Sequence, residues 1–300
     1  MQDESDASDR CKVIGVWCAR VAWVLLPVTT GAAFADALKS WSTAPAALAA
    51  VLLWGVWAGG LLALLAPRPL GLTFLRIAAP CGVAAVACCL SSTSTSSMFV
   101  AIAGVLVAAV LALSPSIEIA AANALAYGDE ERYPLHTPTP LLLGPIPLAV
   151  AVTGAGATAG PLLLAAGHWI SGAVVTIVGL PLAYLLGRSM HVLSKRWFVL
   201  VPAGIAVVEP LTLAEPVLVL RDRIAGLGRF GSTGTPRDAL DLRVGTLFGG
   251  VAIALSEPVG FTRRRGRADA ENVEPSVVLL AVVRASTALA RASRRRIPTR

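Results

Sequence analysis

The most glycine-dense apolar stretch of the chain, TGAGATAGP at residues 153–161, is the first candidate for chemistry. Gly154, Gly156 and Gly160 lack the spacing of a dinucleotide-binding loop, so nucleotide chemistry is not expected there. In a broken membrane helix, these glycines and Pro161 would free backbone groups that hold an ion or a substrate. In an intact helix, Gly156 and Gly160 form a G-x-x-x-G pair for close helix packing. We favour packing.

Charged side chains inside apolar segments are the next candidates, because a charge at the centre of a bilayer costs about 2.5–3.5 kcal/mol on insertion scales. Glu118 follows Pro115, which ends or kinks an apolar segment. We expect Glu118 to lie at the interface, where water solvates it. Arg20 and Arg76 lie near the ends of other apolar segments, and we expect both to extend to the interface. None of the three therefore predicts a substrate path.

Histidines and cysteines offer no recognisable reactive set. His136, His168 and His191 are far apart in the sequence and lie in no carboxylate pattern typical of a metal site or an acid–base pair. None of the five cysteines forms a C-x-x-C pair, and no nucleotide-binding or nucleophile motif occurs. We therefore predict no catalytic residues, no cofactor-binding residues, no metal ligands and no enzyme activity.

Arginine clusters are the remaining candidates for binding. From Arg188 onward the chain has eighteen Lys and Arg against nine Asp and Glu. Contact with anionic headgroups is one interpretation, at about 1 kcal/mol per cation, and a solvated basic surface is the other. Nucleic acid is disfavoured because no aromatic residues are interleaved with the arginines. The residues proposed to contact an anionic surface are Arg263, Arg264, Arg265, Arg267, Arg294, Arg295 and Arg296.

The composition indicates which elements must position these groups. Of the 300 residues, 56% are hydrophobic and 14% are charged, and the mean hydropathy is +0.73. These values are typical of a membrane protein. About 20 apolar residues are needed to cross a bilayer as a helix. Six segments approach or exceed that length, so we predict a bundle of about six transmembrane helices within residues 13–194. The spans lie near residues 13–35, 46–66, 75–90, 98–113, 144–166 and 169–187.

Basic residues near the ends of the spans predict the orientation, because such residues stay on the cytoplasmic side. With both termini inside, nine basic residues lie on the inner side and only Lys39 lies on the outer side. The preference for arginine over lysine suggests a GC-rich bacterial genome, so we predict a bacterial cell (inner) membrane. The inner residues are Arg10, Lys12, Arg20, Arg68, Arg76, Arg132, Arg188, Lys195 and Arg196.

The N-terminal segment allows two interpretations. Residues 1–12 are acidic and are expected to be disordered. The following apolar segment ends in Ala33, Phe34 and Ala35, which resembles a signal-peptide cleavage site. A signal peptide would begin with basic residues, whereas this chain begins with acidic ones, so we favour an uncleaved anchor.

From residue 195 the apolar runs shorten to five or six residues separated by turn formers, which is typical of strands. The segment RWFVLVPAGIAVVE at 196–209 predicts a hairpin, with Pro202 presetting the turn and Gly204 supplying a positive φ. We predict a cytosolic β domain at 195–300 with further strands near 216–221, 239–244, 250–257 and 276–283. Loops are expected at 228–238 and 262–275, and a helix at 284–296.

This order of short strands and a final helix resembles the bacterial pleckstrin-homology-like domains, on the segments RWFVLVPAGIAVVEP and SVVLLAVVRASTALARA. The whole chain is similar to uncharacterised multi-span membrane proteins of actinobacteria that carry such a C-terminal domain. The resemblance implies a small barrel-like fold closed by a helix, and a role in binding or assembly with no shared active site.

The sequence therefore predicts an integral membrane protein that acts as an assembly or regulatory component. Its expected partners are the lipid bilayer and, at the β domain, a protein partner or anionic lipid headgroups. The alternative is a transporter or channel-like carrier that uses the Gly/Pro-rich fifth span.

Overall fold

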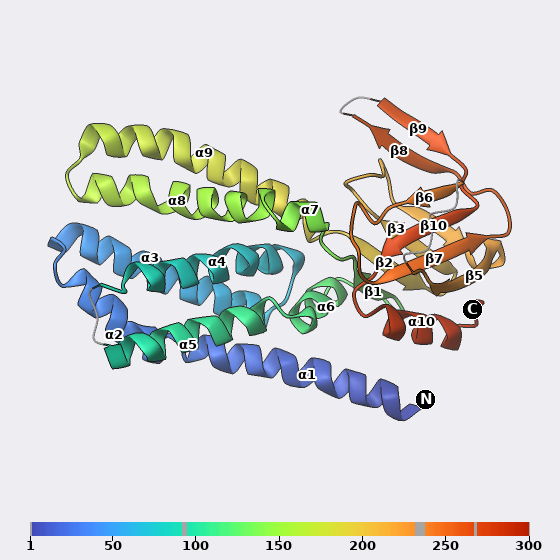
Figure 1. Ribbon diagram of the computed structural model, residues 1–300, viewed down its shortest axis with the longest axis horizontal. Helices are drawn as coiled ribbons and strands as arrows, with labels where there is room; N and C mark the ends of the chain where they lie inside the picture. The colour runs from blue at the N-terminus through green and yellow to red at the C-terminus, as the bar shows by residue number, and fades with distance from the viewer. Residues whose placement is uncertain (1, 92–94, 232–237, 267–268, 300) are drawn as a thin grey trace. The chain divides into compact units, whose positions relative to one another are not determined.

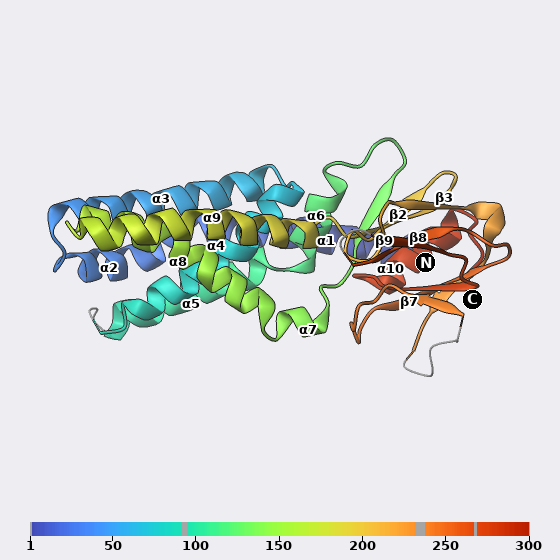
Figure 2. The same ribbon diagram turned by 90° about the horizontal axis from the view of Figure 1, so that it is seen from above.

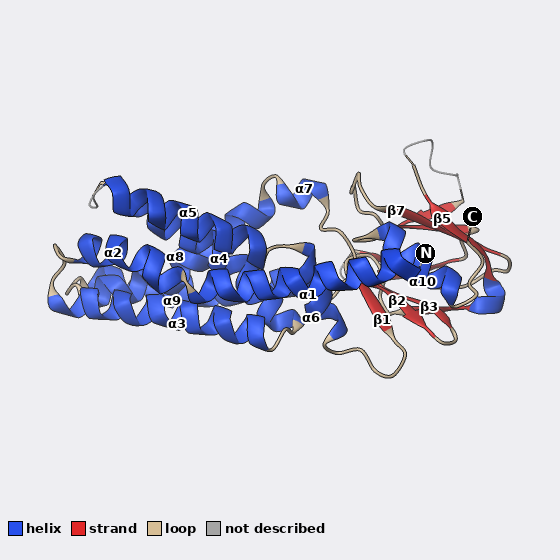
Figure 3. Cartoon of the chain, turned by 90° about the horizontal axis from the view of Figure 1, so that it is seen from below, coloured by secondary structure: helices blue, strands red, loops and turns tan. Residues whose placement is uncertain are grey.

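The computed structural model describes residues 2–91, 95–231, 238–266 and 269–299. The chain divides into two compact units. The helical unit comprises Asp9–Ala121 and Ile146–His191. The β unit comprises Met1–Ser8, Ala122–Pro145 and Val192–Arg300. Figure 3 shows that the strands belong to the C-terminal part of the molecule, joined by one short strand from the middle of the sequence.

Long apolar helices run alongside one another in the helical unit (Figures 1 and 2). Five helical stretches of the described residues are long and apolar enough to cross a membrane, or six if the bent pair formed by α5 and α6 counts as one span. That pair bends by 44° near Pro115, as the proline predicts. The helices are α1 (Gln2–Val24), α2 (Leu26–Leu38), α3 (Thr43–Leu65), α4 (Pro69–Cys88), α5 (Thr95–Ala112), α6 (Pro115–Asn123), α8 (Pro145–Ala165) and α9 (Trp169–Leu193).

The starts of two helices differ from those expected. Helix α1 begins at Gln2 and so includes most of the segment for which we expected disorder. Helix α4 begins at Pro69, ahead of the expected start at residue 75, because Pro69 takes a first-turn position where its missing N–H costs nothing.

Small buried side chains let the helices of this unit approach closely. Alanines such as Ala78, Ala108 and Ala112 are buried between α4, α5 and their neighbours. Large aliphatic side chains such as Val28 and Ile177 instead point outward and are exposed. Lipid is as apolar as leucine, so membrane helices associate through close packing of small residues. The pattern is the one expected of helices surrounded by lipid.

Two four-stranded sheets and a hairpin make up the β unit. The first sheet has the order β1-β2-β3-β4 and is antiparallel throughout. The second has the order β5-β7-β10-β6, and only the β10–β6 pair is parallel. The strands are β1 (Glu131–Pro134), β2 (Trp197–Val201), β3 (Gly204–Val208), β4 (Val217–Leu220), β5 (Ile224–Arg229), β6 (Ala239–Asp241), β7 (Gly250–Leu255), β8 (Phe261–Arg265), β9 (Asp269–Val273) and β10 (Val277–Ala281).

Both sheets contribute side chains to one buried core, which includes Phe198, Ile205, Ile253 and Val278. The final helix, α10 (Ala285–Arg294), buries three alanines of one face in the same core. The C-terminal β-rich domain ending in a helix is thus confirmed. The short elements α7 (Thr139–Leu142) and η1 (Arg221–Arg223) complete the unit.

Strand β1 comes from the connection between two apolar helices rather than from the C-terminal region. Glu131 pairs with Leu200, and Pro134 pairs with Trp197. The β unit, which we expected to begin at residue 195, therefore also includes residues 122–145.

The predicted hairpin at 196–209 is present as β2 and β3, and Gly204 has the expected positive φ, at +157°, but it lies in a strand rather than in the turn. The turn residues are Pro202 and Ala203, and Gly204 is already the first residue of β3. A Cβ atom at Gly204 would collide with the Val219 carbonyl of β4, so close approach between strands requires glycine here.

The prediction of a loop at 262–275 is wrong, because the described residues of this segment form most of the β8–β9 hairpin. Opposite charges on facing strands replace the apolar alternation that would have revealed it. Arg263 lies opposite Glu271, and Arg265 lies opposite Asp269. Such cross-strand pairs stabilise a sheet by roughly 0.2–1 kcal/mol each.

Candidate functional site

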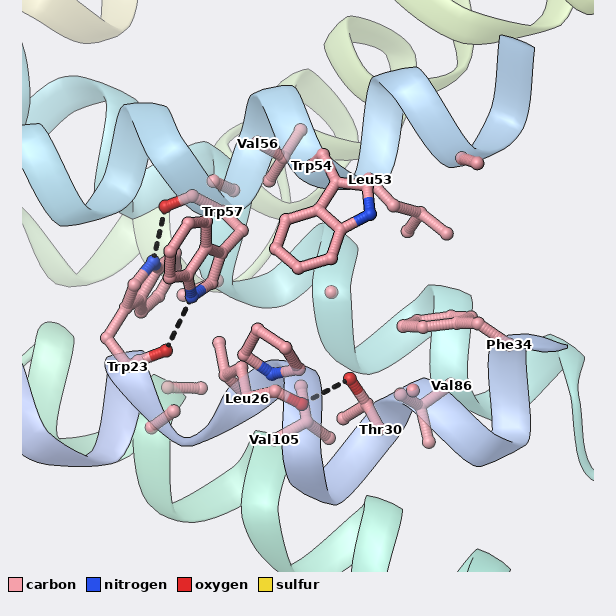
Figure 4. Close-up of a pocket in the computed structure, with 18 of the residues that line it drawn as sticks. Trp23, Leu26, Thr30, Phe34, Leu53, Trp54, Val56, Trp57, Val86 and Val105 are labelled. Carbon is pink, nitrogen blue, oxygen red and sulfur yellow. Dashed lines mark hydrogen bonds between the residues drawn. The ribbon is translucent and has the colours of Figure 1, made fainter. Parts of the chain in front are cut away.

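The helical unit contains an apolar cavity of about 330 Å³ (Figure 4). Side chains from the end of α1 and from α2, α3, α4 and α5 line it, and the lining is almost wholly apolar. The hydroxyl of Thr30 lies at the cavity but already donates a 2.8 Å hydrogen bond to the Leu26 carbonyl. Residues that define the cavity include Trp23, Leu26, Phe34, Trp54, Trp57, Ala78, Val86, Val105 and Ala109.

A proline creates the polar contact at one end of this cavity. Pro27 has no N–H, so the carbonyl four residues earlier, that of Trp23, loses its helical donor. The indole Nε1 of Trp57 donates to that carbonyl at 3.0 Å, and Nε1 of Trp23 donates in return to the Trp57 carbonyl at 2.9 Å. Both indole N–H groups are satisfied, so the two rings join the α1–α2 break to α3 as a fixed wall (Figure 4).

Glycine makes room for one ring of this wall. A Cβ atom at Gly60 would collide with the indole ring of Trp23. Trp54 packs edge-on against Trp57 with ring centroids 5.3 Å apart, and its own side chain is exposed. The chemistry of the cavity suits an apolar ligand, because no charged side chain lines it.

Two charged residues that we expected at the interface form an ion pair with each other. Arg76 Nη2 lies 2.6 Å from Glu118 Oε1, and the two side chains are 19% and 15% exposed. Glu118 is therefore mostly shielded from solvent, and its partner is a guanidinium rather than water. The pair joins α4 to α6, and mutual compensation explains how both charges persist among apolar helices.

Arg20 also has a specific partner. Its Nε donates a 3.0 Å hydrogen bond to the Leu64 carbonyl in the last turn of α3, and its guanidinium lies 5.0 Å from the centre of the Trp17 ring. The last carbonyls of a helix have no helical donors and carry partial negative charge. Arg20 thus caps a helix end instead of reaching only for the interface.

His191 connects the last apolar helix to the third span. Its Nδ1 lies 2.9 Å from Thr73 Oγ1, whose hydroxyl also donates to the Pro69 carbonyl. This contact joins α9 to α4 by a hydrogen bond.

The glycines of the fifth span lie at helix contacts. A Cβ atom at Gly156 would lie 2.6 Å from the Gly179 carbonyl oxygen of α9, and one at Gly160 would collide with Thr176 of the same helix. One at Gly154 would lie 2.6 Å from the Cys81 sulfur of α4. Helix α8 continues through Pro161 to Ala165. The structure thus places α9 and α4 where a path along these glycines would run.

A buried ion pair lies at the base of the first β hairpin. Arg196 and Glu209 immediately flank the hairpin strands, and their side chains are 1% and 0% exposed. Arg196 Nε lies 2.9 and 2.7 Å from the two carboxylate oxygens, and Nη1 donates at 2.8 Å to the His136 carbonyl. Arg196 was counted with Arg188 and Lys195 among the basic residues of the inner side. Its side chain is buried within the β unit, where it ties the chain beyond β1 to the hairpin.

Three of the seven predicted anionic-surface arginines contact other groups of the β unit. Arg264 donates to the Leu213 carbonyl at 3.1 Å, and Arg265 lies 3.5 Å from Glu271. Arg295 binds Glu131 at 3.0 Å and the Leu200 carbonyl at 3.2 Å. Arg263, Arg264 and Arg265 are exposed on β8, Arg294 and Arg296 are exposed at and just beyond the end of α10, and Arg267 lies outside the described residues.

Two carboxylates of the β unit, Glu130 and Asp241, are paired with arginines two residues away in the sequence. Hydrogen bonds from the Arg132 side chain lower the pKa of Glu130, and they outweigh the opposing effect of burial. Burial raises the pKa of Asp241, but hydrogen bonds from the side chain and backbone of Arg243 together outweigh it, so the net shift is downward. Both groups act as fixed anions near neutral pH, so neither is poised for proton transfer.

Among the residues that the structure describes, no three His, Cys, Asp or Glu side chains are arranged to hold a metal ion.

The buried ion pair between Arg196 and Glu209 had a signal in the sequence that we did not use. One charged residue precedes the predicted hairpin and an oppositely charged residue follows it. The apolar cavity had no signal in the sequence, because it depends on packing between helices.

Comparison of the chain with protein-family models, with curated proteins and with solved structures finds no match.

Proposed function

We propose that this chain is a multi-pass protein of a bacterial cell membrane, with both termini cytoplasmic, that acts as an assembly or regulatory component through its β unit. One observation carries the proposal. The unit is built from residues 122–145, which connect two apolar helices, and from residues 192–300, which follow a third. A partner bound to the unit therefore acts on the ends of three membrane helices at once.

A protein partner fits the charges of the β unit better than an anionic bilayer does. Arginines of β8 face carboxylates of β9, which reduces the positive potential of the cluster. Strand β4 offers a different surface, because it is the edge of the first sheet and exposes Leu218 and Leu220. Edge strands with exposed apolar side chains accept an additional strand from a partner. We place the partner on β4.

Affinity purification of the full chain from mildly solubilised native membranes tests this proposal. The variant carries Leu218→Arg and Leu220→Arg, and the matched control carries Leu218→Val and Leu220→Val. Both pairs alter side chains that are exposed, so the fold is preserved in each. We expect the control to retain a specific partner that the arginine variant loses. Recovery of the same partners by both variants would exclude β4 as the docking strand.

The two sheets over one core and the final helix α10 support the resemblance to pleckstrin-homology-like domains, which remains a proposal about ancestry and binding. The carrier alternative finds less support, since close helix contacts occupy the positions of Gly156 and Gly160.

The apolar cavity favours a second candidate function, the binding of a lipid tail within the helical unit. Along α1 and α2 the lining runs from Trp23 to Leu38. Fifteen helical steps correspond to about 22 Å, which is enough for much of an acyl chain. Native mass spectrometry of the full chain would show a retained lipid. Ala109→Phe, which fills the cavity, is expected to abolish retention, whereas retention by this variant would assign the lipid to another surface.

A further inference from the structure

Four large apolar side chains of the β unit lie exposed in two short segments. Leu142 and Leu143 are 50% and 83% exposed, and Leu247 and Phe248 are 80% and 70% exposed. We call these four residues the apolar rim. Full burial of such a side chain is worth roughly 1.5–3 kcal/mol, so their common exposure indicates a surface that something covers.

Two glycines of the second segment pack against side chains that precede the first segment. A Cβ atom at Gly245 would lie 3.2 Å from Pro140 Cγ, and one at Gly249 would lie 2.7 Å from His136 Cδ2. Residues 245–249 therefore pack against residues 136–140, which lead directly into Leu142 and Leu143. The loop that carries half of the rim lies beside the segment that precedes the other half.

The loop at residues 245–249 is held in a defined conformation. Gly245 and Gly249 have φ values of +78° and +69°, which glycine adopts without strain. Thr246 between them is buried, and the Gly249 carbonyl accepts a 2.8 Å hydrogen bond from Val282 N. With both ends anchored, Leu247 and Phe248 project at the tip.

Chain continuity identifies what lies next to the rim. Leu142 ends α7, and Pro145 begins α8, one of the helices able to cross a membrane. Three residue steps cover at most about 11 Å, and the headgroup layer is roughly 5–8 Å thick on each side of the hydrocarbon. Leu142 and Leu143 are thus confined to the bilayer surface at which α8 begins.

We propose that the apolar rim inserts into the lipid leaflet in which α8 begins and attaches the β unit to the bilayer. The occupant is lipid, and the contact is apolar. Arg243, the nearest cation in the sequence, is neutralised by Asp241 at 2.7 Å and packs over the Phe230 ring. The inference requires that α8 spans the membrane, and it is independent of the partner proposed for β4.

Photo-crosslinking of the unmodified full chain tests the rim. The chain is placed in nanodiscs of phosphatidylcholine that include a phosphatidylcholine with a diazirine on its acyl chain, and adducts are located by peptide mapping. Leu218 and Leu220, exposed apolar residues of the same unit on β4, serve as the internal control. Adducts on the apolar helices of the helical unit serve as the positive control that the diazirine reacts.

We expect about tenfold more adduct at residues 245–250 than at residues 217–220, because burial of even one leucine in lipid would shift the equilibrium by that factor. The adduct yield should not change in 1 M salt. Equal yields at the two segments would overturn the proposal. Loss of the adducts in 1 M salt would also overturn it, because the contact would then be electrostatic. Replacing both Leu247 and Phe248 with serine should remove the adducts at 245–250, and their persistence would contradict insertion by these side chains.

Discussion

Replacing Arg196 with methionine should destabilise the β unit more than any surface change. Glu209 would remain fully buried without its cation, and the His136 carbonyl would lose its 2.8 Å donor. Removing one partner of a buried ion pair costs about 3–5 kcal/mol. That free energy corresponds to an increase of about 150-fold to several thousandfold in the population of the open state.

Amide hydrogen exchange of β2 and β3 in the full chain measures this population. Two further variants make the result specific. Arg223→Met removes an arginine from an exposed pair with Glu257, at 3.6 Å, and should change opening by less than about 0.5 kcal/mol. Arg196→Met combined with Glu209→Leu removes both charges and should recover at least about 1 kcal/mol. Equal exchange in Arg196→Met and Arg223→Met would refute the assigned role of the buried pair.

Three further predictions concern glycine contacts and pH. Gly60→Leu forces a side chain into the ring of Trp23, so the free energy of unfolding of the detergent-solubilised chain should fall by about 1–3 kcal/mol. An unchanged melting temperature would contradict the packing of Trp23 against Gly60. Gly156→Leu meets the backbone of α9, and a similar loss should appear as increased proteolysis of the α8–α9 connection. The pKa of Glu130 is lowered by Arg132, so its stabilisation is complete above its unfolded pKa of about 4.3 and is lost as the pH falls through its folded pKa. Glu130→Gln should therefore be less stable than the parent at about pH 6 and equal to it at sufficiently low pH, as amide exchange of β1 would show.

Apolar length and short Val/Leu/Ile runs were sufficient to predict the apolar helices and the hairpin β2–β3, and a run of helix-forming residues predicted the final helix. These features are local, because each residue's own hydrophobicity and its near neighbours determine them. Strand β1 could not be found in this way. Its sequence, ERYP, has charges and a proline, and only pairing with the distant β2 makes it a strand.

The charged groups show the same division. The count of basic residues near the spans treated Arg76 and Arg196 alike, as markers of the inner side. In the structure Arg76 pairs with Glu118, and Arg196 is buried with Glu209. The partner of Arg76 lies in a distant helix, which leaves no periodic signal in the sequence. The partner at the other end of a predicted hairpin was open to inference, since residues that flank a hairpin in register face each other.

The pairing of β1 with β2 is the central structural claim, because it makes the connection between the apolar helices part of the β unit. Disulfide formation in the full chain tests it. Arg132 and Val199 are opposite neighbours. Antiparallel neighbours lie within disulfide range, so cysteines at these two positions should cross-link under mild oxidation. Arg132→Cys with Ala206→Cys places the second cysteine one strand farther away, on β3. That pair should not cross-link, because two strand spacings separate its Cα atoms by roughly 10 Å. Equal cross-linking of both pairs, or none of either, would contradict the account.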